Sequence, residues 1–349
     1  MNMLTLNQIL ENIPALRIGL IGDGCVDIYW EADMRLSELS REVPQHPLPI
    51  INERFSLGAG ANVLANLAAL GAKNIQYVGC VGCDWRGVIF KRLLEQIAVS
   101  SDYLVTSDGI ITPAYCKPIR HGISPVTVED PRIDFINREP FSKELEDRIL
   151  SSLRTVAQSC DILIVCDQFA NGCISNRVIE EVNALGVKMP VIVDSRDRGS
   201  CYKNAIVKPN EVEACATLGL DPDFISQPSA AEHIARALEK RNGRPALITL
   251  GAQGAMWCEN GKCTTVPAVP VSPPIDFVGA GDSFLAGFSL AYVQKFSPED
   301  ALNFASLVSA ITIKKIGTTG VATPEEMRSA LEHYAEVWIP SGTPEKVTV

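Results

Sequence analysis

The sequence predicts an α/β protein with a mostly parallel sheet, helices on both faces of that sheet, and a small β-rich lid. Short apolar runs alternate with longer segments of helical periodicity, which is typical of buried parallel strands joined by crossover helices. Two polar, proline-containing segments interrupt this alternation and indicate the lid. Apolar residues make up 46% of the 349 residues and charged residues 21%, as in ordinary soluble globular proteins.

The expected elements of the core follow one another from the N-terminus. The predicted strands are Arg17–Gly22, Ile75–Val81, Asp161–Cys166, Val191–Asp194, Ala205–Val207 and Ala246–Leu250. Helices are predicted at Asn62–Leu70, which a glycine terminates, and at Trp85–Ile97. A turn, Gly22–Asp27, is expected after the first strand. Because α/β sheets bind ligands at the carboxyl ends of their strands, Asp27 is a candidate ligand contact, whereas Asp23 is expected to be structural.

Residues 31–57 and 113–137 do not match a strand–helix unit. The first segment is polar, contains several prolines and ends in a strand-like run, and the second has a similar character. We predict that both belong to a β-rich lid on a core formed by residues 1–30, 58–112 and 138–349. A pair of irregular surface loops is the alternative interpretation.

Charge and cysteine content narrow the class of function. The formal net charge of −10 argues against a general affinity for nucleic acid or anionic membrane. Met1–Ile13 lacks the pattern of a signal peptide, and no apolar run approaches the ~20 residues that span a bilayer. We therefore expect a cytoplasmic protein whose eleven cysteines are reduced. Cys80 and Cys83 have the spacing of a metal or redox pair, but without a second pair we interpret them as buried residues at a strand end.

The segment Asp276–Gly287 carries the clearest functional signal. Gly279, Ala280 and Gly281 lead directly into a predicted helix, and such a turn presents unpaired backbone N–H groups and the positive end of the helix dipole to an anion. Asp282 follows inside this anion site, where a carboxylate can accept a proton from a substrate hydroxyl. A helix cap is the alternative role for this residue. The turn matches neither a P-loop, which needs a following lysine, nor a dinucleotide fingerprint.

Three further segments accompany the turn Asp276–Asp282 in order along the chain: Gly58–Asn62, Lys208–Glu213 and Thr249–Gly254. Together the four resemble the signature, the N-terminal glycine motif, the Asn-x-x-Glu motif and the nucleotide-bordering turn of the ribokinase-like (PfkB) family of carbohydrate kinases. The chain departs from the signature at Phe277, where the family commonly has threonine. The resemblance covers nearly the whole chain and implies the α/β fold with a lid, ATP as co-substrate and a requirement for Mg²⁺.

The resemblance also implies a role for each candidate residue. Asp282 is implied to be the base that activates a sugar hydroxyl, while the backbone of Gly279, Ala280 and Gly281 stabilises the transferring phosphoryl group. The residues implied to contact the sugar are Asp27, Gly58, Gly60 and Asn62, and those implied to border the nucleotide are Lys208, Asn210, Thr249, Gly251, Gly254 and Ser306. The residues implied to position Mg²⁺ through water are Asn210 and Glu213. Many members also bind a monovalent cation near the position of Asp276.

Each motif has a structural interpretation that the residues alone leave open. The glycine motif also matches a tight turn with Asn62 as a helix N-cap. Asn210 and Glu213 have the spacing of a capping pair, and Ser306 is small enough for a close helix contact. The nucleotide-bordering segment also matches a plain turn after a strand.

Residues of the predicted lid bear on the acceptor. The segments Ser40–Pro44 and Pro47–Ile50 resemble heptose 7-phosphate kinase domains, and Cys116–Arg120 and Arg132–Asp134 fall where that subgroup has basic and acidic residues. An acceptor that already carries phosphate needs cationic partners. The candidates are Arg41, Lys117, Arg120, Arg132 and Arg138, with Arg120 assigned to the sugar site. Exposed strand edges in such a lid favour pairing, so we expect a homodimer.

The leading hypothesis is therefore a kinase that transfers phosphate from ATP to a hydroxyl of a heptose 7-phosphate-like sugar phosphate. A kinase for another small sugar or a nucleoside is one alternative. A catalytically silent sugar-binding regulator is another, although the presence of Asp282, Asn210 and Glu213 argues against it. A nucleotide-cofactor oxidoreductase is disfavoured because no early Gly-x-Gly-x-x-Gly is present.

Overall fold

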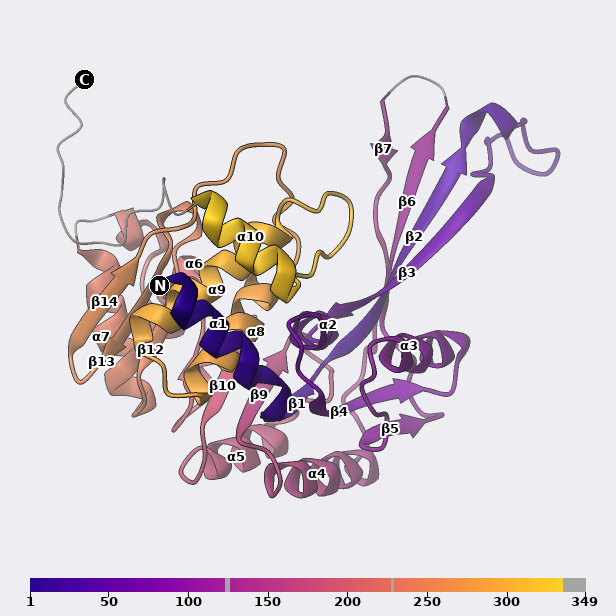
Figure 1. Ribbon diagram of the computed structural model, residues 1–349. Helices are drawn as coiled ribbons and strands as arrows, with labels where there is room; N and C mark the ends of the chain where they lie inside the picture. Colours follow the sequence, from indigo (N-terminus) through magenta and orange to yellow (C-terminus); the bar gives the residue numbers. More distant parts are fainter. Residues whose placement is uncertain (123–125, 227–228, 335–349) are drawn as a thin grey trace.

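The computed structural model describes residues 1–122, 126–226 and 229–334 (Figure 1). Residues 123–125 of the predicted lid, and 227–228 and 335–349 of the predicted core, lie outside the described residues. A parallel sheet runs through the core in the order β11–β10–β9–β1–β4–β5. Its strands are β1 (Arg17–Gly22), β4 (Asn74–Gly82), β5 (Leu104–Ser107), β9 (Ile162–Asp167), β10 (Val191–Ser195) and β11 (Ile206–Val207). The expected parallel sheet is thus confirmed.

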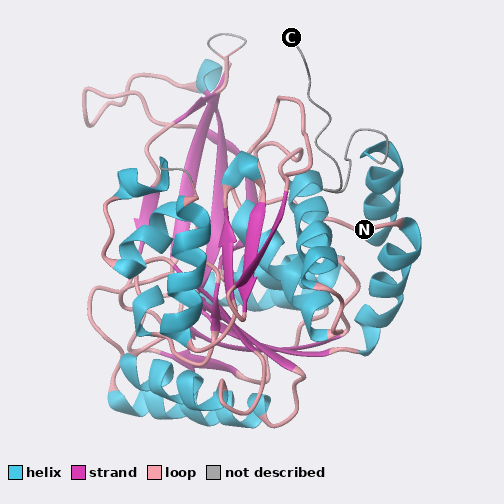
Figure 2. Ribbon diagram, turned by 90° about the vertical axis from the view of Figure 1, so that its left-hand side faces the viewer, coloured by secondary structure: helices cyan, strands magenta, loops and turns pink. Residues whose placement is uncertain are grey.

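Helices cover both faces of this sheet, as the side view shows (Figure 2). Alternate residues of β1 divide between two hydrophobic clusters. Leu20 packs in the cluster that includes α8 (Ala280–Val293) and α9 (Pro298–Thr312), whereas Ile21 packs in the cluster that includes α4 (Lys143–Ala157) and α5 (Asn176–Leu185). Strands buried on both faces read as continuous apolar runs, which explains why β1 was recognisable in the sequence. The α-helices are α1 (Met3–Asn12), α2 (Ala61–Ala69), α3 (Trp85–Gln96), α4 (Lys143–Ala157), α5 (Asn176–Leu185), α6 (Glu211–Leu218), α7 (Ala230–Asn242), α8 (Ala280–Val293), α9 (Pro298–Thr312) and α10 (Pro324–Tyr334).

A second sheet rises from one end of the core (Figure 1). Its strands are β2 (Gly24–Asp33), β3 (Ile50–Ala59), β6 (Ala114–His121), β7 (Val128–Glu129) and β8 (Ile133–Phe135), in the order β3–β2–β6–β7 with β8 paired to β6. We call this sheet the lid. The expected turn Gly22–Asp27 is wrong, because β2 begins at Gly24, and Asp27 therefore lies on a lid strand. The boundaries 31–57 and 113–137 stay a prediction.

The segment Ala246–Leu250 also differs from expectation. It forms β12 (Ala246–Thr249), which pairs antiparallel with β13 (Ala255–Glu259), and β13 pairs with β14 (Lys262–Val266) in a separate sheet. Side chains of β12 are buried on both faces: Ile248 packs with residues of α6 and α7, and Leu247 packs in the main core. A strand covered on both faces reads as a continuous apolar run whatever its direction, so the sequence suggested a parallel strand.

Short 3₁₀ helices lie in several of the connections between these elements. They are η1 (Ile13–Ala15), η2 (Met34–Leu36), η3 (Gly199–Cys201), η4 (Pro222–Ser226) and η5 (Gly251–Gln253). All eleven cysteines are free thiols. Among the helices that the structure describes, none combines the length and apolar character needed to cross a bilayer.

Candidate active site

A cavity of about 920 Å³ lies where β9 and β10 end and where α6 and α8 begin. This is the carboxyl-terminal edge of the parallel sheet, where α/β proteins commonly bind ligands. The sequence-predicted residues that line the cavity are Lys208, Asn210, Glu213, Thr249, Gly251, Gly254, Ala280, Gly281, Asp282 and Ser306. The structure therefore brings together three motifs that are far apart in the sequence. The fourth, the glycine motif, reaches the same site through a hydrogen bond of Asn62.

Asp282 lies in the first turn of α8, on the cavity wall. The helix N-cap is Gly279 with φ of 79°, and no side chain caps this end, so the alternative role of Asp282 as a cap is wrong. Burial raises the pKa of Asp282 to about 7, the hydrogen bond from Asn62 opposes the shift, and the charge of Asp194 adds to it. The carboxyl is partly open to the cavity. A carboxylate with a pKa near neutral pH is suited to general base catalysis.

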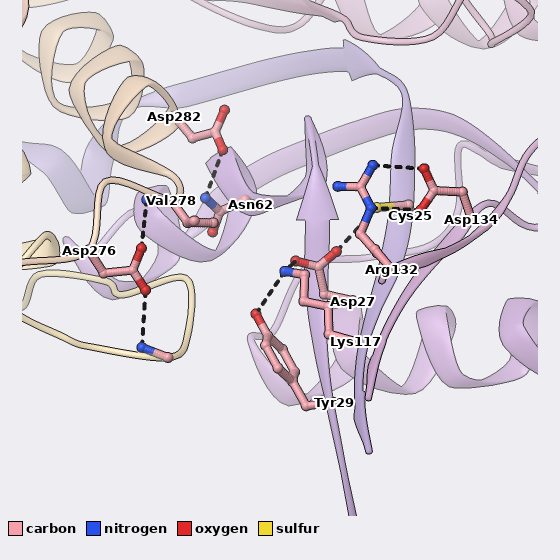
Figure 3. Close-up of polar contacts among 11 residues, drawn as sticks. Cys25, Asp27, Tyr29, Asn62, Lys117, Arg132, Asp134, Asp276, Val278 and Asp282 are labelled. Atoms are coloured by element: carbon pink, nitrogen blue, oxygen red, sulfur yellow. Dashed lines mark hydrogen bonds and ion pairs between the residues drawn. The ribbon is translucent and has the colours of Figure 1, made fainter. Parts of the chain in front are cut away.

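Asn62 connects the glycine motif to this carboxyl. Its Nδ2 atom donates a hydrogen bond of 2.8 Å to Asp282 Oδ2 (Figure 3). The N-cap of α2 is Gly60, whereas Asn62 lies inside the helix, so its alternative role as a cap is wrong. The residue is 1% exposed, and its Oδ1 atom has no hydrogen-bond partner among the described residues. A Cβ atom at Gly279 would lie 2.6 Å from Asn62 Nδ2, so glycine allows this close approach.

Lys208 forms a buried ion pair in the cavity wall. Its Nζ atom lies 3.3 Å from Asp194 Oδ2, and the lysine is 3% exposed. Burial lowers the pKa of Lys208, but the charges of Asp194 and, less strongly, of Glu213 outweigh that effect and raise the pKa overall. The ammonium group therefore stays charged at neutral pH, within a site that otherwise contains several carboxylates.

Asn210 and Glu213 form a capping box at the start of α6. Asn210 Oδ1 accepts a hydrogen bond of 2.8 Å from the backbone N–H of Glu213, and Glu213 Oε2 accepts one of 2.9 Å from the backbone N–H of Asn210. The capping role left open by the sequence is thus present. Both residues also line the cavity, and burial raises the pKa of Glu213. Their oxygen atoms, with those of Asp194, suit Mg²⁺, which keeps several waters and needs few protein ligands.

The lid contributes a second group of charged residues. Asp27 and Tyr29 on β2 pair in register with Tyr115 and Lys117 on β6, so all four side chains point to one face of the lid. Lys117 Nζ lies 3.3 Å from Asp27 Oδ2 and 3.2 Å from the Tyr29 hydroxyl (Figure 3). We call this face, which carries Asp27, the inner face of the lid. A Cβ atom at Gly58 would lie 2.5 Å from Asp27 Oδ1, so glycine is needed beside this carboxylate.

The candidate cations of the lid divide between its two faces. Arg132 forms two hydrogen bonds with Asp134 and lies over the ring of Tyr115, on the inner face with Lys117. Arg120 pairs in register with Ala32 and therefore lies on the opposite face, where it forms an ion pair of 2.6 Å with Asp130. Arg41 lies in an exposed loop and Arg138 lines a separate cavity of about 380 Å³. The structure brings Lys117, rather than Arg120, next to Asp27.

Asp23 has the structural role that was expected. Its two carboxylate oxygens accept hydrogen bonds of 2.7–2.9 Å from the backbone N–H groups of Gln168, Phe169 and Cys173. The residue is 2% exposed, and burial raises its pKa to about 6. Asp23 thereby fixes the loop after β9, which carries Gln168 to the cavity.

Known proteins are similar to this chain in sequence over most of its length. A model of the pfkB family carbohydrate kinases matches residues 26–325. This chain belongs to that family. The kinase is 27% identical over 336 residues to the "Bifunctional protein HldE" of Hydrogenovibrio crunogenus and 30% identical over 317 residues to that of Sulfurimonas denitrificans. These alignments cover 93% and 88% of the kinase but 65% and 63% of the relatives, so the chain spans about two thirds of their length.

Solved structures share the fold of the kinase. Ribokinase of Arabidopsis thaliana, solved with ribose and ATP, superposes with a TM-score of 0.65 at 21% identity and covers 91% of the kinase and 99% of its own chain. Phosphofructokinase-2 of Escherichia coli superposes with a TM-score of 0.71 at 17% identity over 92% of the kinase and 100% of its own chain. The ribokinase-like fold expected from the motifs is thus confirmed.

Several cavity residues of the kinase were not identified from its sequence. Asp194 lies at the carboxyl end of a strand that was predicted, and this position could have identified it as a site residue. Arg196 and Gln168 follow strand ends in the same way. The segment 268–275 supplies an apolar wall of the cavity, and no periodic pattern marked it as part of the site.

Proposed function

We propose that this sugar kinase transfers the terminal phosphoryl group of ATP to a hydroxyl of a phosphorylated sugar, with Asp282 as general base. The observation that carries the proposal is the position of Asp282 in the first turn of α8, where it lines the cavity and accepts a hydrogen bond from Asn62 (Figure 3). Its raised pKa, about 7, suits a group that must take a proton at neutral pH.

The proposed step balances without a redox partner. The acceptor hydroxyl oxygen bonds to the γ-phosphorus of ATP, the bond from that phosphorus to the bridging oxygen breaks, and ADP leaves. The hydroxyl proton passes to Asp282. Since Asn62 occupies Oδ2, the free oxygen Oδ1 is the one that accepts this proton. Backbone N–H groups of Gly279 and Gly281, at the positive end of α8, stabilise the charge on the phosphoryl group in transfer, whereas that of Ala280 already donates to the carbonyl of Phe277 at 3.1 Å.

Three residues at the sheet edge are proposed to hold the metal. Asn210, Glu213 and Asp194 supply oxygen atoms at the cavity wall, and one oxygen of Glu213 is free of the capping box. A bound Mg²⁺ ion would neutralise charge on the β- and γ-phosphates. Thr249, Gly251, Gly254 and Ser306 are proposed to border the nucleotide, and a monovalent cation is proposed near Asp276. The carboxylate of Asp276 already binds the backbone N–H groups of Val278 and Gly317, which supports the shape of this turn.

The inner face of the lid is proposed to select the acceptor. Asp27 can accept bonds from adjacent sugar hydroxyls, beside Gly58 and Gly60. Lys117 and Arg132 lie on the same face and offer positive charge to a phosphate that the sugar already carries. These contacts, together with the resemblance of the lid segments to heptose 7-phosphate kinase domains, favour a heptose 7-phosphate-like acceptor.

We also propose that the lid pairs with a second copy of the chain. Strand β3 is an edge strand of the lid, and Ile50 and Ile51 on it are 40% and 57% exposed. Sedimentation velocity at micromolar concentration is expected to show a dimer. Monomers alone at that concentration would contradict the pairing, while leaving the proposed reaction untouched.

An acceptor screen tests the proposed reaction. ADP release from Mg-ATP is measured with free hexoses, pentoses, nucleosides and sugar phosphates, including a heptose 7-phosphate, and Lys117→Met serves as a variant of the acceptor site. We expect turnover with sugar phosphates, and a rise in KM for them in the variant with little change for ATP. Equal turnover of unphosphorylated sugars would refute the acceptor class. No turnover on any acceptor, with sugar and ATP still bound, would favour a silent regulator.

A further inference from the structure

Two cavity-lining residues carry a positive charge within the described part of the chain, and they differ in their partners. Lys208 is paired with Asp194 at 3.3 Å. Arg196 lines the same cavity but forms no ion pair or side-chain hydrogen bond with any described residue. The guanidinium of Arg196 is exposed at the cavity and is therefore available to bind an anion with two parallel hydrogen bonds.

The backbone around Arg196 is held firmly. Its N–H donates a hydrogen bond of 3.0 Å to the carbonyl of Asp167. The hydroxyl of the preceding Ser195 donates a bond of 2.8 Å to Asp167 Oδ2 and accepts one of 3.1 Å from the backbone of Arg198. The Tyr202 hydroxyl also donates to Asp167 Oδ2, at 2.9 Å. This turn therefore presents the Arg196 side chain from a fixed point at the end of β10.

The neighbouring arginine of the same turn serves a different purpose. Arg198 is half-buried and binds Asp167, with its Nε atom 3.1 Å from Oδ2. One arginine thus supports the turn, while the other remains free to bind an anion. Burial raises the pKa of both Glu213 and Tyr115, and the charge of Arg196 opposes the shift at each. The positive charge of Arg196 is therefore felt both at Glu213, a proposed metal-binding residue, and at Tyr115 on the inner face of the lid.

We propose that Arg196 binds the terminal phosphoryl group of the nucleotide as it passes to the acceptor, and is a further catalytic residue of the kinase. The inference rests on the proposed function, because it needs a nucleotide phosphate in this cavity. A guanidinium can bind two phosphoryl oxygens at once and stabilises the charge that the group carries during transfer. The alternative ligand of the guanidinium is the phosphate that the acceptor already carries.

Binding measurements separate these two ligands. Calorimetry compares ADP with β,γ-methylene-ATP, each with Mg²⁺, on the wild type, Arg196→Gln and Arg196→Lys. Arg92→Gln, which removes an exposed charge from α3, is the control for net charge. We expect Arg196→Gln to lower the affinity for β,γ-methylene-ATP by about tenfold or more and the affinity for ADP by less than about twofold. The same variant should lower kcat by about 100-fold. Arg196→Lys should lie between, since lysine keeps the charge but not the two-point contact.

Three results would overturn the assignment. They are unchanged binding of both nucleotides, equal weakening of both, and a rise confined to the KM of a phosphorylated acceptor, which would assign Arg196 to the acceptor phosphate. If the wild type lacks kinase activity altogether, the proposed function fails. The effect of Arg196→Gln on the two nucleotide affinities then still tests whether Arg196 binds the terminal phosphoryl group. Circular dichroism of each variant shows whether the turn has remained folded.

Discussion

Replacing Asp282 by asparagine is expected to stabilise the protein without ligands, and to do so only at higher pH. Burial raises the pKa of this carboxyl from 3.8 to about 7, so the folded protein binds its proton more tightly than the unfolded chain does. The stability that the protonated form contributes is complete below pH 3.8 and is lost as the pH rises through about 7. Asparagine avoids this loss, and its carbonyl oxygen can still accept the hydrogen bond from Asn62.

The size of the effect follows from the shift. A change of about three pKa units corresponds to roughly 4 kcal/mol at about 1.4 kcal/mol per unit, which is an upper limit. Because the carboxyl is partly open to the cavity, water screens its charge, and we expect a gain of about 2 kcal/mol above pH 7. The gain should shrink steadily below pH 7 and be close to zero near pH 4.

Urea denaturation of the wild type and Asp282→Asn at pH 5, 6, 7 and 8 measures this difference. The free energies of unfolding should diverge as the pH rises, with similar dependence on urea concentration in both proteins. A difference that does not change with pH would refute the reasoning, and so would a variant that is less stable than the wild type at pH 8. Either result would mean that the ionised carboxyl of Asp282 does not lower the free energy of unfolding of the ligand-free protein.

Three further predictions test the geometry of the site. Asn62→Ala removes a hydrogen bond that lowers the pKa of the proposed base, so the acidic limb of the kcat/KM profile should move to higher pH; an unmoved limb would contradict this. Gly58→Ala places a Cβ atom 2.5 Å from Asp27 Oδ1, so KM for the acceptor should rise by about tenfold or more while the affinity for nucleotide, measured by calorimetry, stays constant. Lys117→Met should raise the KM of a phosphorylated acceptor by about tenfold, whereas Arg120→Met, on the opposite face, should change it less than about twofold; equal effects would refute the assigned faces.

Local patterns allowed much of the fold to be predicted from the sequence. The parallel strands are buried on both faces and read as apolar runs, and the turn at Gly279 marks the start of α8. Strand β2 was missed because its glycine and acidic residues suggested a turn. Its alternation was nevertheless present, since Val26 and Ile28 are buried in the core cluster while Asp27 and Tyr29 face Lys117.

Contacts between distant segments were beyond the reach of the sequence. Asn62 and Asp282 are 220 positions apart, and nothing local indicates that one binds the other. Likewise, the choice between Lys117 and Arg120 depends on the register of β6 against β2, because a shift of one residue exchanges the two faces. The sequence also does not show which arginine of the turn binds Asp167, whereas the folded turn assigns that contact to Arg198.

The most direct test of the account is a single-turnover measurement with Asp282→Asn. Enzyme in excess over radiolabelled Mg-ATP is mixed with the acceptor found in the screen, and labelled sugar phosphate is followed over time, with nucleotide and acceptor affinities measured in parallel. If Asp282 takes the hydroxyl proton, the rate of transfer should fall by about 10²–10⁴-fold while both affinities stay within about threefold of the wild type. Transfer at an undiminished rate would show that another group performs this step.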